Sequence, residues 1–559
     1  MKHLGLVLAL VLIAGCGKED IEEPTGDLKV DERPNILLIV ADDLGFSDLG
    51  AYGGEISTPT LDQLAASGMM LTNFHTSLTC APTRAMLLTG EDNHVAGLGN
   101  MVETTADNQL GLPGYEGHLS KSIPTIAEQL RSAGYHTYLS GKWHLGTSYE
   151  AAPHKRGFDQ TFGPIYGGGS HFSDRVGPEH DRRDLLYREN GELVFDLPED
   201  FYSTEFFTSR AIQQIDSNLK DGKPFFAYVA YTAPHWPLQV PDEHLELYRG
   251  KYDAGYDEIR KARLTRMASL GLLDADLSEY RPPDFVTRWA DLDNAAQLSE
   301  ARNMEIYAAM VDYLDASIAR LLDYLEQHGE LDNTLIIFLS DNGAEAWSDS
   351  FGPPAWTPGR FASQFDNSLQ NRGRIGSFVF TGPGWSQVSN APFAWYKGFT
   401  GEGGTRVPSF AVWPERIPAG QRSSALVSVA DWYHTIADAS GLPTQERGSP
   451  TDSLSLMPLL SGTATRVRGE DDILGMEMWG RQAVYMGDWK LVSMPEPAGP
   501  GGTQLYNLVE DPMELNDLSS QEPERLQAMQ AAWQRYVEDN NVVLPEGPFR
   551  IRPPVIPQR

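Results

Sequence analysis

Cys80, Pro82 and Arg84 lie within five residues of one another, in a stretch that has the character of a helix start. Pro82 suits the first turn of a helix, because its missing N–H would have no intrahelical partner there. A helix start carries free N–H groups and partial positive charge, and Arg84, one turn beyond Cys80, would add a full charge on the same face. The spacing predicts a thiol beside an anion-binding position. The alternative is an inert buried cysteine.

Acidic side chains follow two apolar runs that are typical of buried strands. Asp42 and Asp43 come directly after the run at 35–40, and Asp341 and Asn342 come soon after the run at 334–339. Ligand sites in open α/β sheets lie at the carboxyl ends of strands, so these side chains converge if the two strands are neighbours. Three carboxylates and an amide form an all-oxygen set that suits Ca²⁺ or Mg²⁺ and not zinc. The alternative is a pair of Asp-rich turns that cap helices.

Basic residues follow other expected strands. Lys142 and His144 alternate in a loop bracketed by glycines, which favours a loop that reaches into a pocket. His235 ends a further strand, and Lys397 precedes a glycine-rich segment. Each is a weak signal by itself, because a lone Lys is normally solvated and a lone His is normally structural. His94 is a lesser candidate for the pocket wall, with a structural role as its alternative.

Cys80, Pro82 and Arg84, followed by Thr89 and Gly90, resemble the Cys-x-Pro-x-Arg signature of the formylglycine-dependent type I sulfatases. In that family a maturation enzyme oxidises the cysteine to Cα-formylglycine. Other motifs of the family occur in order along almost the whole chain, with most similarity to the bacterial arylsulfatases. These motifs are Asp42-Asp43, Gly141-Lys142-Trp143-His144-Leu145-Gly146, Ala233-Pro234-His235-Trp236-Pro237, Asp341-Asn342-Gly343, Tyr396-Lys397-Gly398-Phe399-Thr400, Glu402-Gly403-Gly404-Thr405-Arg406 and Leu505-Tyr506-Asn507-Leu508.

The resemblance implies which residues act. Residue 80, as the hydrate of formylglycine, would supply the nucleophile, with Asp341 as its base. His144 would deprotonate the second hydroxyl so that sulfate leaves, and His235 and Lys397 would assist the departing alcohol. The implied catalytic residues are Cys80, Arg84, Lys142, His144, His235 and Lys397; the implied substrate-binding residues are Lys142, His235 and Lys397; the implied Ca²⁺ ligands are Asp42, Asp43, Asp341 and Asn342.

Expected strands and helices alternate along the chain, which predicts an α/β protein with a doubly wound sheet. Strands are expected at 35–40, 135–139, 224–230 and 334–339, and helices at 60–69, 122–133 and 304–328. Short strands at 483–486, 489–492 and 504–508, with a helix at 521–537, predict a smaller C-terminal antiparallel sheet plus helix. The resemblance implies that the large sheet is mixed, flanked by helices and alkaline-phosphatase-like.

The N-terminal residues read as a leader and a tether. Residues 1–16 are expected to be a processing segment, whose apolar run from Leu4 to Gly15 is too short to span a bilayer. Ile13-Ala14-Gly15-Cys16 resembles a bacterial lipobox. Cys16 would then carry lipid, and residues 17–33 would be a flexible tether. This predicts an exported lipoprotein that faces the periplasm or is anchored in the outer membrane. A plain signal peptide is the alternative.

Two further units are expected after the tether. The catalytic domain would span 34–480, with a helical insertion at about 242–302 that covers the site entrance, and a C-terminal subdomain would span 481–559. Cys16 and Cys80 are the only cysteines in the sequence. If one carries lipid and the other is oxidised, none remains for a disulfide.

Composition limits the class of partner. The net charge is −33, from 77 acidic and 44 basic residues, which argues against binding of nucleic acid. The expected partners are a small-molecule or carbohydrate sulfate ester, the maturation enzyme, and a membrane through the lipid on Cys16. Two other functions stay open: a phosphonate or phosphate monoester hydrolase of the same superfamily, and a non-catalytic lipoprotein that binds sulfated glycans. A binding module would not need a convertible cysteine.

Overall fold

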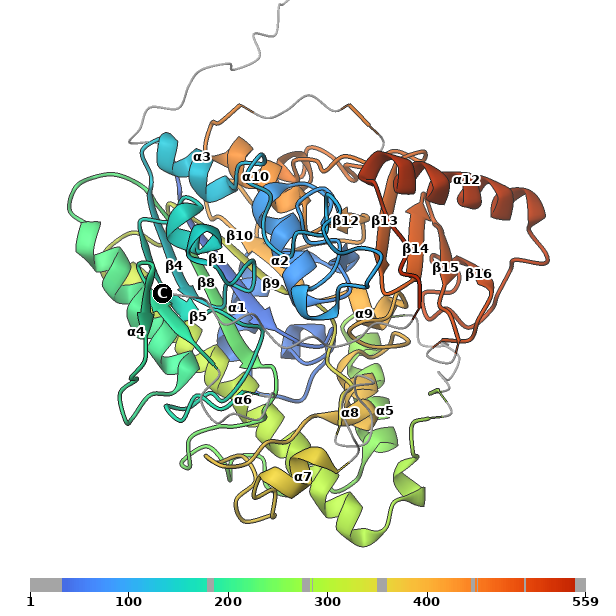
Figure 1. Ribbon diagram of the computed structural model, residues 1–559, viewed down its shortest axis with the longest axis horizontal. Helices are drawn as coiled ribbons and strands as arrows, with labels where there is room; N and C mark the ends of the chain where they lie inside the picture. The colour runs from blue at the N-terminus through green and yellow to red at the C-terminus, as the bar shows by residue number, and fades with distance from the viewer. Residues whose placement is uncertain are drawn as a thin grey trace, which may run out of the picture.

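The computed structural model describes residues 33–177, 185–273, 282–283, 285–348, 359–443, 448–449, 451–496 and 499–547 (Figure 1). The predicted leader and tether, with Cys16, lie outside the described residues apart from Arg33. Within the described part, no helix combines the length and the apolar character needed to cross a bilayer.

A large mixed sheet forms the centre of the molecule, and β1 (Asn35–Asp42) lies in its interior. The strand order is β11-β2-β10-β9-β1-β8-β4-β5-β6-β7. β1 pairs in parallel with β9 (Thr334–Ser340) on one side and with β8 (Phe225–Pro234) on the other. The remaining strands are β2 (Met69–Leu71), β4 (His136–Gly141), β5 (Gln160–Pro164), β6 (Tyr187–Glu189), β7 (Glu192–Val194), β10 (Ser409–Val412) and β11 (Gln421–Ser423).

Helices cover both faces of this sheet, as the sequence predicts. Every residue of β1 is buried, and its side chains alternate between two hydrophobic clusters because successive residues of a strand point to opposite faces. Ile36, Leu38 and Val40 pack in the cluster that includes α2 (Cys80–Thr89), α3 (Ile126–Ser132) and α10 (Asp431–Ala439). Leu37 and Ile39 pack in the cluster that includes α1 (Pro59–Ser67), α4 (Ser203–Asn218) and α6 (Asn294–Gln327).

The region expected as a helical insertion is helical only in part. It contains α5 (Tyr256–Ser269) and the beginning of α6. α6 starts at Asn294, ten residues before the predicted start, so a boundary at residue 302 falls inside a continuous helix. The smaller elements elsewhere are β3 (Phe74–His75), β12 (Val427–Ser428), α7 (Arg360–Gln364), α8 (Gly382–Ser389), α9 (Glu402–Thr405) and α11 (Met457–Leu460), with 3₁₀ turns at Gly50–Tyr52, Val102–Thr104, Tyr149–Ala151, Pro153–Lys155 and Trp289–Asp291.

A second, antiparallel sheet with one long helix lies toward the C-terminus, coloured orange to red in Figure 1. Its strands are β13 (Ile473–Met478), β14 (Arg481–Met486), β15 (Trp489–Ser493) and β16 (Thr503–Asn507), and its helix is α12 (Pro523–Asn540). β13 precedes residue 481, so the sheet begins before the boundary expected from sequence. Met529 and Tyr536 of α12 pack against Val484 and Leu505 of the sheet.

Candidate active site

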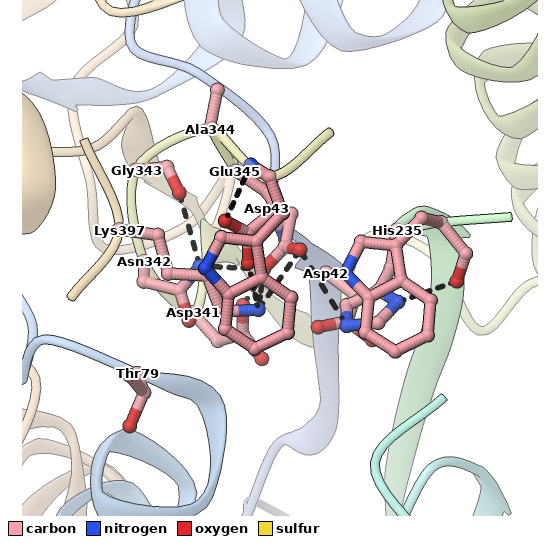
Figure 2. Close-up of polar contacts among 12 residues, drawn as sticks. Asp42, Asp43, Thr79, His235, Asp341, Asn342, Gly343, Ala344, Glu345 and Lys397 are labelled. Carbon is pink, nitrogen blue, oxygen red and sulfur yellow. Dashed lines mark hydrogen bonds and ion pairs between the residues drawn. The ribbon is translucent and has the colours of Figure 1, made fainter. Parts of the chain in front are cut away.

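The predicted acidic residues meet where two neighbouring strands end. β1 ends at Asp42, and Asp341 and Asn342 follow β9, its parallel neighbour. The Asp43 backbone N–H donates to the Asp341 carboxylate at 3.2 Å, and the Asn342 amide donates to Asp43 Oδ1 at 2.6 Å (Figure 2). The condition on which the sequence prediction rested, adjacency of the two strands, is therefore met.

Cys80 is the first residue of α2, and Thr79 is its N-cap. The side chain is 2% exposed, and burial raises the pKa of the thiol to about 12 although Lys142 and Lys397 act to lower it. A thiol with that pKa is protonated at neutral pH and is a poor nucleophile. The unmodified cysteine is therefore unsuited to attack an ester.

Arg84 lies on the same helix and is completely buried. Its Nε and Nη2 both donate to Asp341 Oδ2, at 2.9 and 2.7 Å, and its Nη1 donates to the Lys142 carbonyl and the Tyr228 hydroxyl. With these donors engaged, Arg84 holds Asp341 and the loop of Lys142. From the sequence, the Arg84 charge was expected beside an anion-binding position near Cys80. In the structure it pairs with the Asp341 carboxylate.

Lys142 enters the site from the carboxyl end of β4. Gly141 makes this possible: it has a φ of +120°, and a Cβ there would lie 1.9 Å from the Ala230 carbonyl oxygen on β8. The Lys142 ammonium donates to both oxygens of Asp42, at 3.0 and 2.7 Å. Burial alone would lower the pKa of Lys142, but Asp42 outweighs it and raises that pKa, so the group stays charged.

Lys397 makes the matching contact on the other aspartate. Its ammonium donates to both oxygens of Asp43, at 2.7 and 2.9 Å, and lies 3.4 Å from Glu345 Oε2 (Figure 2). Burial would raise the pKa of Asp43, but Lys397, with His235 and Lys142, holds it at about 2. The Asp43 carboxylate is therefore ionised across the physiological range.

The two predicted histidines have different surroundings. His235 follows β8, donates from Nδ1 to the Trp236 carbonyl at 2.7 Å, and places Nε2 3.6 Å from Asp43 Oδ2. Burial lowers the pKa of His235 well below its usual value, so its ring is neutral. His144 Nε2 lies 3.5 Å from Glu103 Oε1, and burial lowers the pKa of His144 as well.

Glu345, Glu103 and a pair of glycines belong to the site but were not singled out from the sequence. Burial raises the pKa of Glu345 to about 7 despite the nearby Lys397. A Cβ on Gly167 would lie 2.6 Å from the His144 ring, and one on Gly168 would lie 2.4 Å from the His235 ring. The run of three glycines at 167–169 was the available signal for this close approach.

The carboxylate and amide oxygens of the site suit a hard cation. Asn342 Oδ1 is buried without a hydrogen-bond partner, next to the three aspartates. Burial and the neighbouring Asp42 raise the pKa of Asp341 to about 6. A cation among these carboxylates would offset their mutual repulsion and lower that pKa again. Carboxylate and amide oxygens are the ligands that Ca²⁺ takes.

His94, the lesser candidate for the site, contacts other residues. It lies between Asp92 and Glu477, with Nδ1 2.7 Å from the first and Nε2 3.2 Å from the second, and it packs edge-on against Tyr536 of α12. These contacts tie the catalytic sheet to the C-terminal sheet, in keeping with the structural alternative.

The site as a whole is a buried cluster of carboxylates paired with cations. Lys142 and Lys397 each bridge to one aspartate, and neutral His235 lies beside them. Such a site can bind the oxygens of a tetrahedral anion, polarise it, and offer a proton to a leaving oxygen.

Comparisons with known proteins agree on one family. The sulfatase family model matches residues 34–442. A sulfatase of Schizosaccharomyces pombe described as uncharacterised is 39% identical over 93% of this chain and 96% of its own length, and an arylsulfatase of Klebsiella aerogenes is 39% identical over 77% and 90%. The crystal structure of Ps i-CgsB in complex with a neocarrahexaose has a TM-score of 0.65 at 26% identity, covering 91% of this chain and 93% of that one. The chain therefore belongs to the sulfatase family and is a sulfuric ester hydrolase.

Proposed function

We propose that the chain cleaves sulfate monoesters with residue 80 in the formylglycine form and with Ca²⁺ held by Asp42, Asp43, Asp341 and Asn342. The observation that carries this proposal is the convergence of Lys142, Lys397 and His235 on carboxylates beside Cys80. The formylglycine hydrate would supply a nucleophilic hydroxyl and a second hydroxyl for release of sulfate. Bound Ca²⁺ would supply positive charge against the sulfate oxygens.

The chain's own residues would handle the protons. Asp341, which Arg84 holds in place through two hydrogen bonds, suits the role of base for the attacking hydroxyl at residue 80. His144 is neutral with a buried Nδ1 that lacks a hydrogen-bond partner, and Glu103 orients its other nitrogen, so it suits the second deprotonation. Lys397 would donate hydrogen bonds to the sulfate and the leaving oxygen, and His235 would line the substrate site beside it. Arg84 would act as a positioning residue through its two bonds to Asp341.

We place the substrate among aryl and carbohydrate sulfate esters. The Klebsiella relative is named an arylsulfatase, whereas the structural relative Ps i-CgsB was solved with a neocarrahexaose. Trp236 stacks near Trp347 with ring centroids 5.9 Å apart, and the Trp236 ring lies 4.4 Å from that of His235. An aromatic surface next to His235 suits either a phenol or the apolar face of a sugar.

The test compares 4-nitrophenyl sulfate, the corresponding phosphate, a phosphonate monoester and a sulfated monosaccharide. It uses protein supplied with Ca²⁺, whose residue 80 is shown by peptide mass to be the aldehyde. We expect a clear preference for the sulfate esters. Preference for the phosphorus esters would favour the phosphonate or phosphate monoester hydrolase, and binding of sulfated glycans without turnover would favour the non-catalytic lipoprotein.

We also propose that the chain is exported and anchored through lipid on Cys16. The lipobox-like sequence ending at Cys16 supports this, and the acidic tether that follows would hold the enzyme away from the membrane. Metabolic labelling with a fatty-acid analogue tests it, because Cys16→Ser should abolish labelling while Cys80→Ser should keep it.

A further inference from the structure

A mixed set of ligand atoms surrounds Cys80 before any modification. One atom each from Asp42, Asp43, Cys80 and His235 lies within 4.8 Å of the others, and all four residues are buried. This set contains sulfur and nitrogen as well as oxygen. It therefore differs from the all-oxygen set proposed above for Ca²⁺.

The orientation of His235 is that of a metal ligand. Its Nδ1 must carry the proton, because it donates to a backbone carbonyl, that of Trp236, at 2.7 Å. Nε2 then presents a lone pair toward the ionised Asp43, at 3.6 Å. Two electron-rich atoms face one another, an arrangement that a cation between them would stabilise. Histidines that bind metals commonly donate their other N–H to a carbonyl in this way.

The carboxylates keep enough free lone pairs to bind a metal. A carboxylate offers about four acceptor positions. Lys142 uses two on Asp42, whereas Lys397 and the Asn342 amide together use three on Asp43. Each of the two carboxylates thus keeps at least one position for a metal.

We propose that the folded chain that still carries the Cys80 thiol binds a zinc-type divalent cation through Cys80, His235, Asp42 and Asp43. Thiolate, imidazole and carboxylate are the ligands of protein zinc sites, whereas Ca²⁺ takes oxygen alone. Binding breaks the S–H bond, forms the sulfur–metal bond and releases the proton to solvent. Conversion of the thiol to formylglycine removes the sulfur, so the cation that the pocket prefers changes with the chemical state of residue 80.

Cobalt is the probe, because a cobalt–thiolate bond gives a charge-transfer absorption that cobalt bound by oxygen and nitrogen lacks. The sample is full-length chain made without the maturation enzyme, with the thiol verified by peptide mass and metals removed by chelation. Titration with Co²⁺ should give the thiolate band, Zn²⁺ should abolish it, and calorimetry in buffers of different ionisation enthalpy should detect proton release. Cys16→Ser should keep the band, and Cys80→Ser should lose it.

Two further variants separate this site from the proposed Ca²⁺ site. His235→Ala should weaken Co²⁺ binding by at least about tenfold. Asn342→Ala should keep the cobalt band and weaken Ca²⁺ binding more than Co²⁺ binding, because Asn342 contacts the shared ligand Asp43 but supplies an oxygen only to the Ca²⁺ site. Absence of the band, or equal loss of Co²⁺ binding in both variants, would overturn the proposal. Circular dichroism of each metal-free variant checks that it folds. Because the experiment uses unconverted protein, its outcome is independent of sulfate ester hydrolysis by the converted enzyme.

Discussion

Each cation at the site is paired with one aspartate. Lys142 forms an ion pair with Asp42, Lys397 with Asp43, and Arg84 with Asp341. Each aspartate comes from a strand end, whereas each cation comes from another segment of the chain. The pairs therefore hold strands, helix α2 and the later loops in one geometry. Loss of one partner would leave a buried charge uncompensated, which is more costly than loss of an exposed pair.

The nucleophile position offers a direct prediction. Cys80→Ser can accept the sulfuryl group from an ester, but a serine sulfate has no second hydroxyl on the same carbon to expel sulfate. We expect a single burst of alcohol release, with no further turnover and a mass gain of one SO₃ group on the peptide that contains residue 80. Continued turnover by this variant at the rate of the converted enzyme would show that the hydrate is not needed.

Glu345 is predicted to position Lys397. Its Oε2 lies 3.4 Å from the Lys397 ammonium, and it is the second carboxylate near that group after Asp43. We expect Glu345→Gln to lower kcat by between about tenfold and a hundredfold, because a small misplacement of a catalytic group has effects of this size. KM should change much less.

The matched control is Glu326→Gln, an exposed glutamate on α6, which should leave both constants unchanged. Glu345→Asp keeps the charge and should recover part of the rate. Equal activity of Glu345→Gln and the unsubstituted enzyme would remove Glu345 from the site.

At the scale of elements, α5 is held to the loop after β1 by a buried arginine. Arg263 donates to Asp48 at 2.6 Å and to both oxygens of Glu55 at 2.7 and 2.8 Å. Tyr307 of α6 donates to the same Asp48 at 2.7 Å. Asp48 thus joins α5 and α6 to the loop that follows the strand delivering Asp42 and Asp43.

Substitution of this arginine should destabilise the protein strongly. Arg263→Met leaves Asp48 and Glu55 without a buried cation, so we expect the free energy of unfolding to fall by about 3–5 kcal/mol. Arg266→Met is the control: it lies on the same helix and contacts the same Glu55, but its side chain is 38% exposed, so its loss should cost less than about 1 kcal/mol. Urea denaturation measures both, and equal losses would contradict the argument.

Sequence patterns located the elements that bury continuous apolar runs, and they did less well elsewhere. β1, β8 and β9 were expected because such runs are typical of central parallel strands. β13 was missed because Gly475 and Glu477 interrupt its apolar pattern. A Cβ at Gly475 would lie 2.2 Å from the Tyr536 ring, so the glycine serves helix packing.

The site residues also divide into those that the sequence indicated and those that it did not. Strand ends and motifs indicated the aspartates and the lysines. Glu345 could not be recognised, because its significance depends on contact with Lys397, 52 positions away. Nor does the sequence show that Arg84 pairs with Asp341 instead of facing the anion, because that depends on how α2 packs beside β9.

At the scale of the whole molecule, buried charge joins the four-stranded C-terminal sheet to the rest of the described chain. Lys490 of β15 contacts Glu402 of α9 at 2.9 Å and Glu514 at 2.7 Å, and His94 contacts Glu477 of β13. Burial would lower the pKa of His94, but Asp92 and Glu477 outweigh burial and raise it to about 9. A protonated His94 therefore stabilises the junction at neutral pH.

This shift predicts how stability depends on pH. The folded pKa is above the unfolded one, so the contribution of His94 is fully present below about pH 6.5 and is lost as pH rises through about 9. Thermal unfolding of the protein and of His94→Gln should therefore differ most in Tm near pH 6 and converge toward pH 10. A Tm difference that stays constant over this range would show that His94 does not titrate there.

The pairing of each cation with a carboxylate has a consequence for how the enzyme acquires an anion. The chain as a whole carries −33 charges, and the lysines that would bind a sulfate group already have counter-ions of their own. Long-range attraction can therefore contribute little to substrate capture. An ester would be held by exchange of partners at contact distance, where added salt screens little. The enzyme would therefore discriminate among anions by how well each fits the site once bound. Electrostatic attraction from solution would contribute little to that choice.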